Sequence, residues 1–281
     1  MKKHFFITIT CIFALAFSSC YTLQKRIAGS LPPQDELSQI FDSIIQEGYC
    51  LYFSERANWV ATDLVSEKYD MDKLGGSISW QPNDTVWHVV FFDKDNENSL
   101  IECHFYINSN KIVTIDSVRP ITNLEKELLQ RKETMINEAF TKYGKDMTFA
   151  PQSFGNPNID IVCINDKLTR VYFLQGTIKQ NIIPFGNDYS VDFDENLTPI
   201  AFRRYHRSLI EIPTITDKGE KVKLTYHTHL PDNPYITPTD ICNFLLYSPE
   251  SMNEFCVLST AYGCMLVFNK DQRQIVIENI R

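Results

Sequence analysis

The sequence contains no Cys-x-x-Cys pair, although it holds 8 cysteines. Zinc sites built from thiolates generally use such closely spaced pairs, so the sequence argues against a site of that kind. Cys11 and Cys20 fall in the N-terminal segment. The others are Cys50, Cys103, Cys163, Cys242, Cys256 and Cys264. Disulfides and buried free thiols both stay open for these, because connectivity cannot be derived from spacing.

Basic residues are also few, with 27 Lys and Arg against 35 Asp and Glu. A net charge of −8 argues against nucleic acid as a partner and against a polybasic contact with anionic lipid. The content of hydrophobic residues is 43%, and that of aromatic residues is 12%. These values favour a globular chain with a packed core over a disordered one.

Long apolar runs are missing beyond the N-terminus, so no later segment is expected to span a membrane. Residues 5–17 are mostly apolar and follow Lys2 and Lys3. As a helix they would extend about 20 Å, which is shorter than the ~30 Å hydrocarbon core of a bilayer. A basic start and a short apolar run are typical of a signal peptide.

The end of this segment, Ser18-Ser19-Cys20, resembles the lipobox of bacterial lipoproteins, with Phe17 where that pattern usually has Leu. The resemblance implies that residues 1–19 are a signal peptide and that Cys20 carries the lipids, palmitate among them. Residues 20–34 would then be a tether, and the protein would be exported and anchored to a bacterial membrane in the cell envelope. The alternative is an ordinary signal peptide with a cysteine nearby.

The expected fold is mixed α/β, beginning with a small N-terminal α+β domain over residues 35–120. Apolar residues from Leu37 to Ile45 recur at helical spacing. Residues 51–69 then form a second helix or a continuation beyond Gly48, and Gly75-Gly76 is expected to break it. Alternation predicts an antiparallel meander at residues 77–80, 86–92, 100–107 and 111–118. Trp59, Trp80 and Trp87 are expected in the core of this domain, and His88 and His104 are interpreted as structural.

A second domain is expected over residues 121–281. Thr122 or Asn123 can cap a helix that runs to about Tyr143 and ends at Gly144. A later helix is expected at residues 238–247. Strands are predicted at residues 159–164, 169–178, 189–193, 199–205, 221–226, 255–259, 264–268 and 275–278. The basic stretch 202–207 is interpreted as a strand end with solvated arginines rather than an anion site.

Candidate metal-ligating residues cluster in the segment 226–240, YHTHLPDNPYITPTD. His227 and His229 lie two apart on an expected strand, so their side chains point to one face, where two imidazoles can bind one zinc ion. Thr237 and Pro238 are typical of a helix start. Asp240 in the first turn could supply a third ligand and leave a fourth position open.

This spacing resembles the JAMM (MPN-type, JAB-like) metalloprotease signature, H-[ST]-H-x7-S-x-x-D, with Thr237 in place of the serine. The resemblance implies a JAB-like, deaminase-like α/β fold for residues 121–281. It also implies zinc as the cofactor, with His227, His229 and Asp240 as ligands, and a catalytic role for Thr237 in stabilising an oxyanion. The expected hairpin at residues 255–268 is similar to the strand pair that follows the signature.

The sequence departs from the family at the general base, a glutamate on an early strand of the domain. The corresponding residues 169–177 contain no acid. Acids that could substitute are Asp188, Asp192, Asp194, Glu195 and Glu211.

The leading hypothesis is a membrane-anchored lipoprotein whose JAB-like domain is a zinc-dependent peptidase or isopeptidase. One alternative is a non-catalytic JAB-like module that binds a peptide or an envelope protein. Another is a structural envelope lipoprotein whose histidines are buried without metal.

Overall fold

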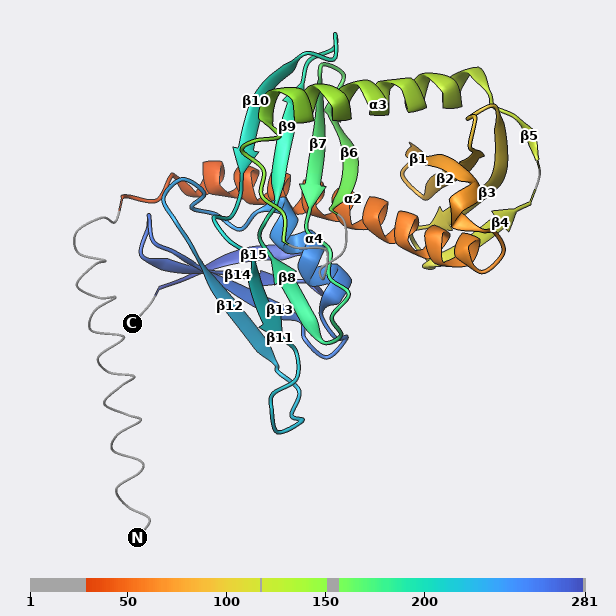
Figure 1. The fold of residues 1–281 in the computed structure, drawn as a ribbon. Coiled ribbons are helices and arrows are strands. Elements are labelled where there is room, and N and C mark those ends of the chain that lie inside the picture. The colour runs from red at the N-terminus through yellow and green to blue at the C-terminus, as the bar shows by residue number, and fades with distance from the viewer. Residues whose placement is uncertain (1–28, 117, 151–156, 280–281) are drawn as a thin grey trace. The chain divides into compact units, whose positions relative to one another are not determined.

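The protein is described by a computed structural model that covers residues 29–116, 118–150 and 157–279 (Figure 1). The predicted signal peptide and Cys20 lie outside these residues. No helix in the described ranges is both long and apolar enough to cross a membrane. The fold is mixed α/β with mostly antiparallel sheets, as predicted for the fold class at this level.

Three α-helices lie in the described part of the chain: α2 (Gln34–Ser66), α3 (Asn123–Tyr143) and α4 (Pro238–Tyr247). Helix α2 is continuous through Gly48, so the continuation that the sequence left open is confirmed. A Cβ atom added at Gly48 would lie 2.8 Å from the Cβ atom of Ile241 in α4. Glycine is therefore required by the close approach of two helices rather than by a break in one.

Thr122, one of the two capping residues that the sequence left open, caps helix α3 and forms a capping box. The Thr122 hydroxyl accepts from the Glu125 backbone N–H, and the Glu125 carboxylate accepts from the Thr122 backbone N–H. Both bonds satisfy donors that the first turn of a helix leaves without an intrahelical partner.

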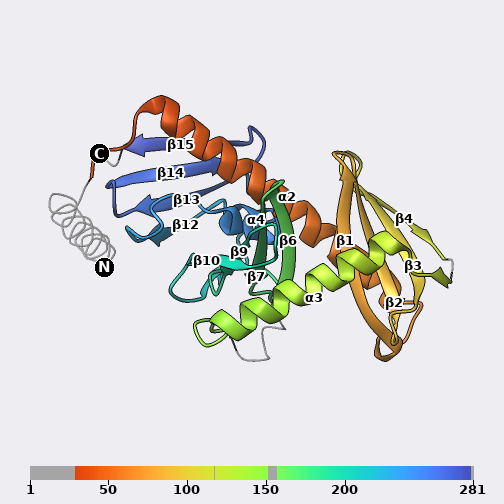
Figure 2. The same cartoon turned by 90° about the horizontal axis from the view of Figure 1, so that it is seen from above.

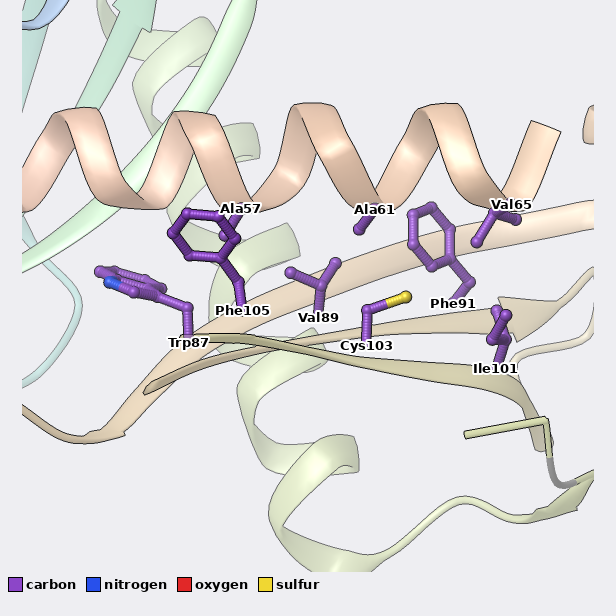
Figure 3. Packing of buried hydrophobic residues seen from close by; sticks show 9 residues of the cluster. All are labelled: Ala57, Ala61, Val65, Trp87, Val89, Phe91, Ile101, Cys103 and Phe105. Atoms are coloured by element: carbon purple, nitrogen blue, oxygen red, sulfur yellow. The ribbon is translucent and has the colours of Figure 1, made fainter. Parts of the chain in front are cut away.

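The predicted N-terminal meander is confirmed (Figure 2). It consists of β1 (Leu74–Asn83), β2 (Val86–Asp93), β3 (Asn98–Tyr106) and β4 (Lys111–Ile115), with the short β5 (Arg119–Pro120) paired to β3; the 3-10 turn η1 (Met71–Lys73) precedes it. Small residues of α2 face one side of the sheet, which lets the large side chains of β2 and β3 approach the helix axis (Figure 3). This core contains Ala57, Ala61, Val65, Trp87, Val89, Phe91, Ile101, Cys103 and Phe105.

Two predictions about this region were wrong. Gly75 and Gly76 lie inside β1 rather than at a break, and a Cβ atom at Gly75 would lie 2.1 Å from the Asp93 carbonyl oxygen. Trp59 is 41% exposed and contacts Tyr247 at 5.8 Å between ring centroids, so it is not a core residue. Trp87 is buried as expected, and Trp80 is partly buried. Helical periodicity places Trp59 off the face that Ala57 and Ala61 present to the sheet.

A second antiparallel sheet has the order β10-β9-β7-β6 and packs against α3. Its strands are β6 (Asn158–Asn165), β7 (Leu168–Leu174), β9 (Tyr189–Phe193) and β10 (Pro199–Arg204). The pair β8 (Ile182–Phe185) and β11 (Ile210–Pro213) was not predicted. Each strand is only 4 residues long and contains a proline, which weakens the alternating pattern.

The fourth sheet has the order β12-β13-β14-β15. Its strands are β12 (Leu224–His229), β13 (Glu254–Ser259), β14 (Cys264–Asn269) and β15 (Gln274–Asn279). Strands β12 and β13 are parallel and are joined in sequence by α4, whereas β13, β14 and β15 form antiparallel hairpins.

The chain divides into two compact units. One holds the residues up to Ile45 with Ile215–Thr237 and Pro249–Arg281, and the other holds Gln46–Thr214 and Pro238–Ser248. The domains predicted at residues 35–120 and 121–281 stay a prediction.

Candidate metal centre

The histidine pair lies on β12, where buried and exposed residues alternate. His227 is 5% exposed and His229 is 2% exposed, while Thr228 between them faces outward. Their Nε2 atoms are 3.0 Å apart. The Nδ1 atom of His229 lies 2.6 Å from the Tyr235 carbonyl oxygen, which can only accept, so Nδ1 carries a proton and, in the neutral ring, Nε2 holds the lone pair. This is the form in which a histidine binds metal.

His206, which follows β10, lies between two carboxylates. Its Nδ1 atom is 2.9 Å from both oxygens of Asp188, and its Nε2 atom is 3.2 Å from Oδ1 of Asp240. Burial lowers the pKa of His206, but the charges of Asp188 and Asp240 outweigh it and hold the pKa well above its ordinary value. The Thr239 hydroxyl donates to the other side of Asp188.

Four buried ligand atoms form one group. His206, His227, His229 and Asp240 each offer one ligand atom, and these atoms all lie within 4.8 Å of one another. The group could hold a metal ion. It includes all three residues predicted as ligands from the sequence, together with His206, which sequence reasoning had assigned to a solvated strand end. His206 is 5% exposed, and no spacing rule connects it to the motif on β12.

The donor set fits zinc. Three imidazole nitrogens and one carboxylate oxygen are ligands that zinc commonly takes. With Zn–N distances of about 2.0–2.1 Å, tetrahedral ligand atoms lie roughly 3.3 Å apart. The separations of 3.0 Å between the His227 and His229 nitrogens and 3.2 Å between His206 and Asp240 are close to this value. Asp188 and the Tyr235 carbonyl hold the outer nitrogens of two ligands, as partners of metal-bound histidines do.

The other predicted site residues have varied environments. Thr237 is buried immediately before α4, and its oxyanion role stays a prediction. Of the acids considered as a base, Asp188 contacts His206. Asp192 forms ion pairs with Arg170 and Arg203, and Glu211 forms one with Lys179. Asp194 accepts hydrogen bonds from backbone N–H groups in its own turn, and Glu195 is exposed.

All six cysteines in the described ranges are free thiols, the second of the two alternatives that the sequence left open. Five are at least partly buried, and Cys163 is exposed. Burial raises the pKa of the Cys50, Cys103 and Cys256 thiols to about 11.

A second group of potential ligands lies on β2 and β3, where His88, Glu102 and His104 approach one another while partly exposed. Glu102 accepts from His104 at 2.7 Å and from Arg119 at 3.1 Å, and it lies 3.1 Å from His88. These contacts account for the three side chains as a charge network.

No protein-family model, curated protein or solved structure matches the chain. The fold is therefore described as mixed α/β, and the buried His206, His227, His229 and Asp240 group defines its candidate metal centre.

Proposed function

We propose that this chain is a zinc-binding module of JAB-like type in which His206, His227, His229 and Asp240 hold the ion. The convergence of four buried ligand atoms within 4.8 Å carries the proposal. Metal binding would offset the cost of burying these polar groups, because each would exchange hydration for a coordinate bond.

With His206 as a fourth protein ligand, the site would be closed. Structural zinc sites have four protein ligands, whereas catalytic sites keep one position for water or substrate. The low exposure of the four residues, between 0% and 5%, also favours a closed site. The function that this geometry supports best is a metal-stabilised binding module that does not hydrolyse its ligand, a peptide or an envelope protein.

Zinc content tests the proposal. The protein is purified without chelator or metal-affinity resin and assayed by elemental analysis. We expect about one zinc per chain, lost in His229→Ala and retained in the control His104→Ala, which removes a histidine of the second group. No zinc after incubation with the ion, or equal loss in both variants, would contradict the site.

A zinc-dependent peptidase or isopeptidase is the second candidate, favoured by the contact between Asp188 and His206. A zinc ion with an open position would polarise a carbonyl and activate water. His206 Nε2 would then accept a proton, Asp188 would orient the ring, and Thr237 would donate to the oxyanion. The His206–Asp188 pair would thereby do the work of the glutamate that residues 169–177 lack.

One variant separates the two candidates. If His206 is a ligand, His206→Ala weakens zinc binding, and the wild type cleaves no member of a peptide library. If His206 is a base, His206→Ala keeps its zinc and loses a cleavage activity that the wild type shows.

We also propose that Cys20 is lipidated and anchors the chain to a bacterial membrane in the envelope, on the strength of the lipobox resemblance. Labelling a bacterial host with a palmitate analogue should mark the protein. Cys20→Ser should lose the label and Cys11→Ser should keep it. Label that persists in Cys20→Ser would contradict the anchor.

A further inference from the structure

A cavity of about 520 Å³ lies outside the metal centre. It is lined by residues of α2, β1, α3, β6 and α4 and by the segment after β7. Its volume falls within the range of small-molecule sites, about 300–1,000 Å³. The proposed metal chemistry uses none of its residues.

Two buried carboxyl groups from distant parts of the chain meet in this cavity. Glu55 on α2 is 5% exposed, and Asp160 on β6 is 4% exposed. Each accepts a hydrogen bond from a neutral group: the Asn158 amide donates to Glu55 Oε2 at 2.7 Å, and the Ser54 hydroxyl donates to Asp160. Burying two acids side by side is costly, and such a pair in a cavity is a candidate functional site.

Glu55 has unused hydrogen-bonding capacity. No donor in the described residues reaches its Oε1 atom, which is buried. Burial and the neighbouring Asp160 carboxylate raise the pKa of Glu55 well above its ordinary value. A polar ligand in the cavity would give Oε1 a partner and recover part of the desolvation cost.

The cavity contains ionisable groups of both signs. Lys132 lines the same cavity, where its Nζ atom donates to the Ser77 carbonyl oxygen at 2.9 Å and interacts electrostatically with Asp160. Acidic and basic groups in one cavity complement a neutral ligand with several hydroxyl groups better than an ion of a single sign.

An aromatic surface borders these polar groups. The Trp59 ring is 41% exposed and lies 5.8 Å from the Tyr247 ring, at 39° between planes. Both residues line the cavity, as does Asn58, whose amide is 3.5 Å from Asp160. An exposed aromatic face beside carboxyl and amide groups complements a molecule with apolar C–H faces and hydroxyl edges.

We propose that this cavity binds a carbohydrate, with a sugar ring on Trp59 and its hydroxyl groups hydrogen-bonded to Glu55 and Asp160. The site binds without cleaving. The carboxyl groups of retaining glycosidases are separated by about 5–5.5 Å, and those of inverting enzymes by more. Glu55 and Asp160 lie within hydrogen-bond reach of one another and leave no room for a glycosidic bond between them.

The test uses the full chain on an array of bacterial, plant and animal glycans, followed by calorimetric titration with the oligosaccharide that binds best. We expect Asp160→Asn to weaken binding about tenfold or more, the loss expected for a hydrogen bond to a charged group. Trp59→Ala should weaken binding to a similar extent, because it removes the aromatic surface under the sugar ring. Tyr106→Ala, which removes an aromatic residue that is 40% exposed and does not line the cavity, should leave the affinity unchanged.

Three further measurements separate an effect at the cavity from loss of the metal centre and from loss of the fold. Glu55→Gln preserves the shape of the side chain and should bind within about threefold of wild type. His229→Ala should bind normally, so failure of the metal centre and failure of this site are distinguishable. Thermal unfolding of each variant identifies loss of fold. Binding to no glycan, binding to peptides instead, or glycan binding unaffected by Trp59→Ala and Asp160→Asn in folded protein would overturn the proposal.

Discussion

The Nδ1 atom of His206 lies 2.9 Å from both carboxylate oxygens of Asp188. Asp188 is 0% exposed, and it also accepts from the Thr239 hydroxyl, so its position is set from two sides. The contact directs Nε2 of His206 toward Asp240. A histidine held in this way is fixed in tautomer and in ring orientation before any ion binds.

Asp188→Asn should therefore weaken zinc binding without removing a ligand. Loss of a carboxylate that supports a metal-bound histidine typically costs about 10–100-fold in metal affinity. Competition with a chromogenic chelator measures this change. The control is Asp166→Asn, an exposed aspartate in the turn between β6 and β7. Equal zinc affinity of Asp188→Asn and wild type would show that His206 is not a ligand.

The Arg119–Glu125 ion pair should make stability depend on acid pH. Arg119 holds the pKa of Glu125 at about 2, helped by the Thr122 N–H and hydroxyl. Because the folded-state pKa lies below the ordinary value of 4.5, the stabilisation is present above pH 4.5 and is lost as the pH falls toward 2. Its size should be on the order of 2 kcal/mol.

Urea unfolding between pH 2 and pH 6 measures this effect. Glu125→Gln should be less stable than wild type at pH 6, and the difference should shrink toward pH 2. Glu127→Gln, an exposed residue on the same helix, is the control. A constant difference between wild type and Glu125→Gln across this range would rule out the linkage.

Gly48→Ala should destabilise the protein even though alanine favours helices by about 1 kcal/mol. The added methyl group would lie 2.8 Å from the Ile241 Cβ atom, and overpacking of this kind costs roughly 1–3 kcal/mol. Gly76→Ala is the matched control, because a Cβ atom there would meet nothing within 4 Å. The urea concentrations at the unfolding midpoints of both variants are compared with that of wild type. An increase in stability for Gly48→Ala would contradict the close helix contact.

Among the six cysteines of the described residues, Cys163 should react first in the folded protein. It is exposed, whereas burial disfavours the reactive thiolate at Cys50, Cys103 and Cys256. Iodoacetamide labelling followed by peptide mass analysis should find the modification mainly at Cys163. Cys163→Ser should abolish the fast phase. Fast labelling that persists in that variant at one of the other five cysteines of the described residues would contradict the prediction.

Local patterns predicted much of the secondary structure. The capping residue Thr122, the helical spacing from Leu37 and the alternation along β2 and β3 each express a preference within a short window, so the elements could be derived from them. Strands β8 and β11 were not predicted, because a four-residue strand that contains proline shows no clear alternation of apolar and polar residues. Trp59 was misassigned because aromatic character alone does not say which face of a helix a residue occupies.

The amino-acid sequence by itself determined that His227 and His229 share a face of a strand and that Asp240 lies in the first turn of a helix. These relations depend only on the repeats of strand and helix. Only the tertiary structure decided that His206 joins them, that Asp188 orients it, and that Glu55 and Asp160 meet in one cavity. Contacts between residues distant in sequence depend on how whole elements pack against one another, and no local periodicity records that packing.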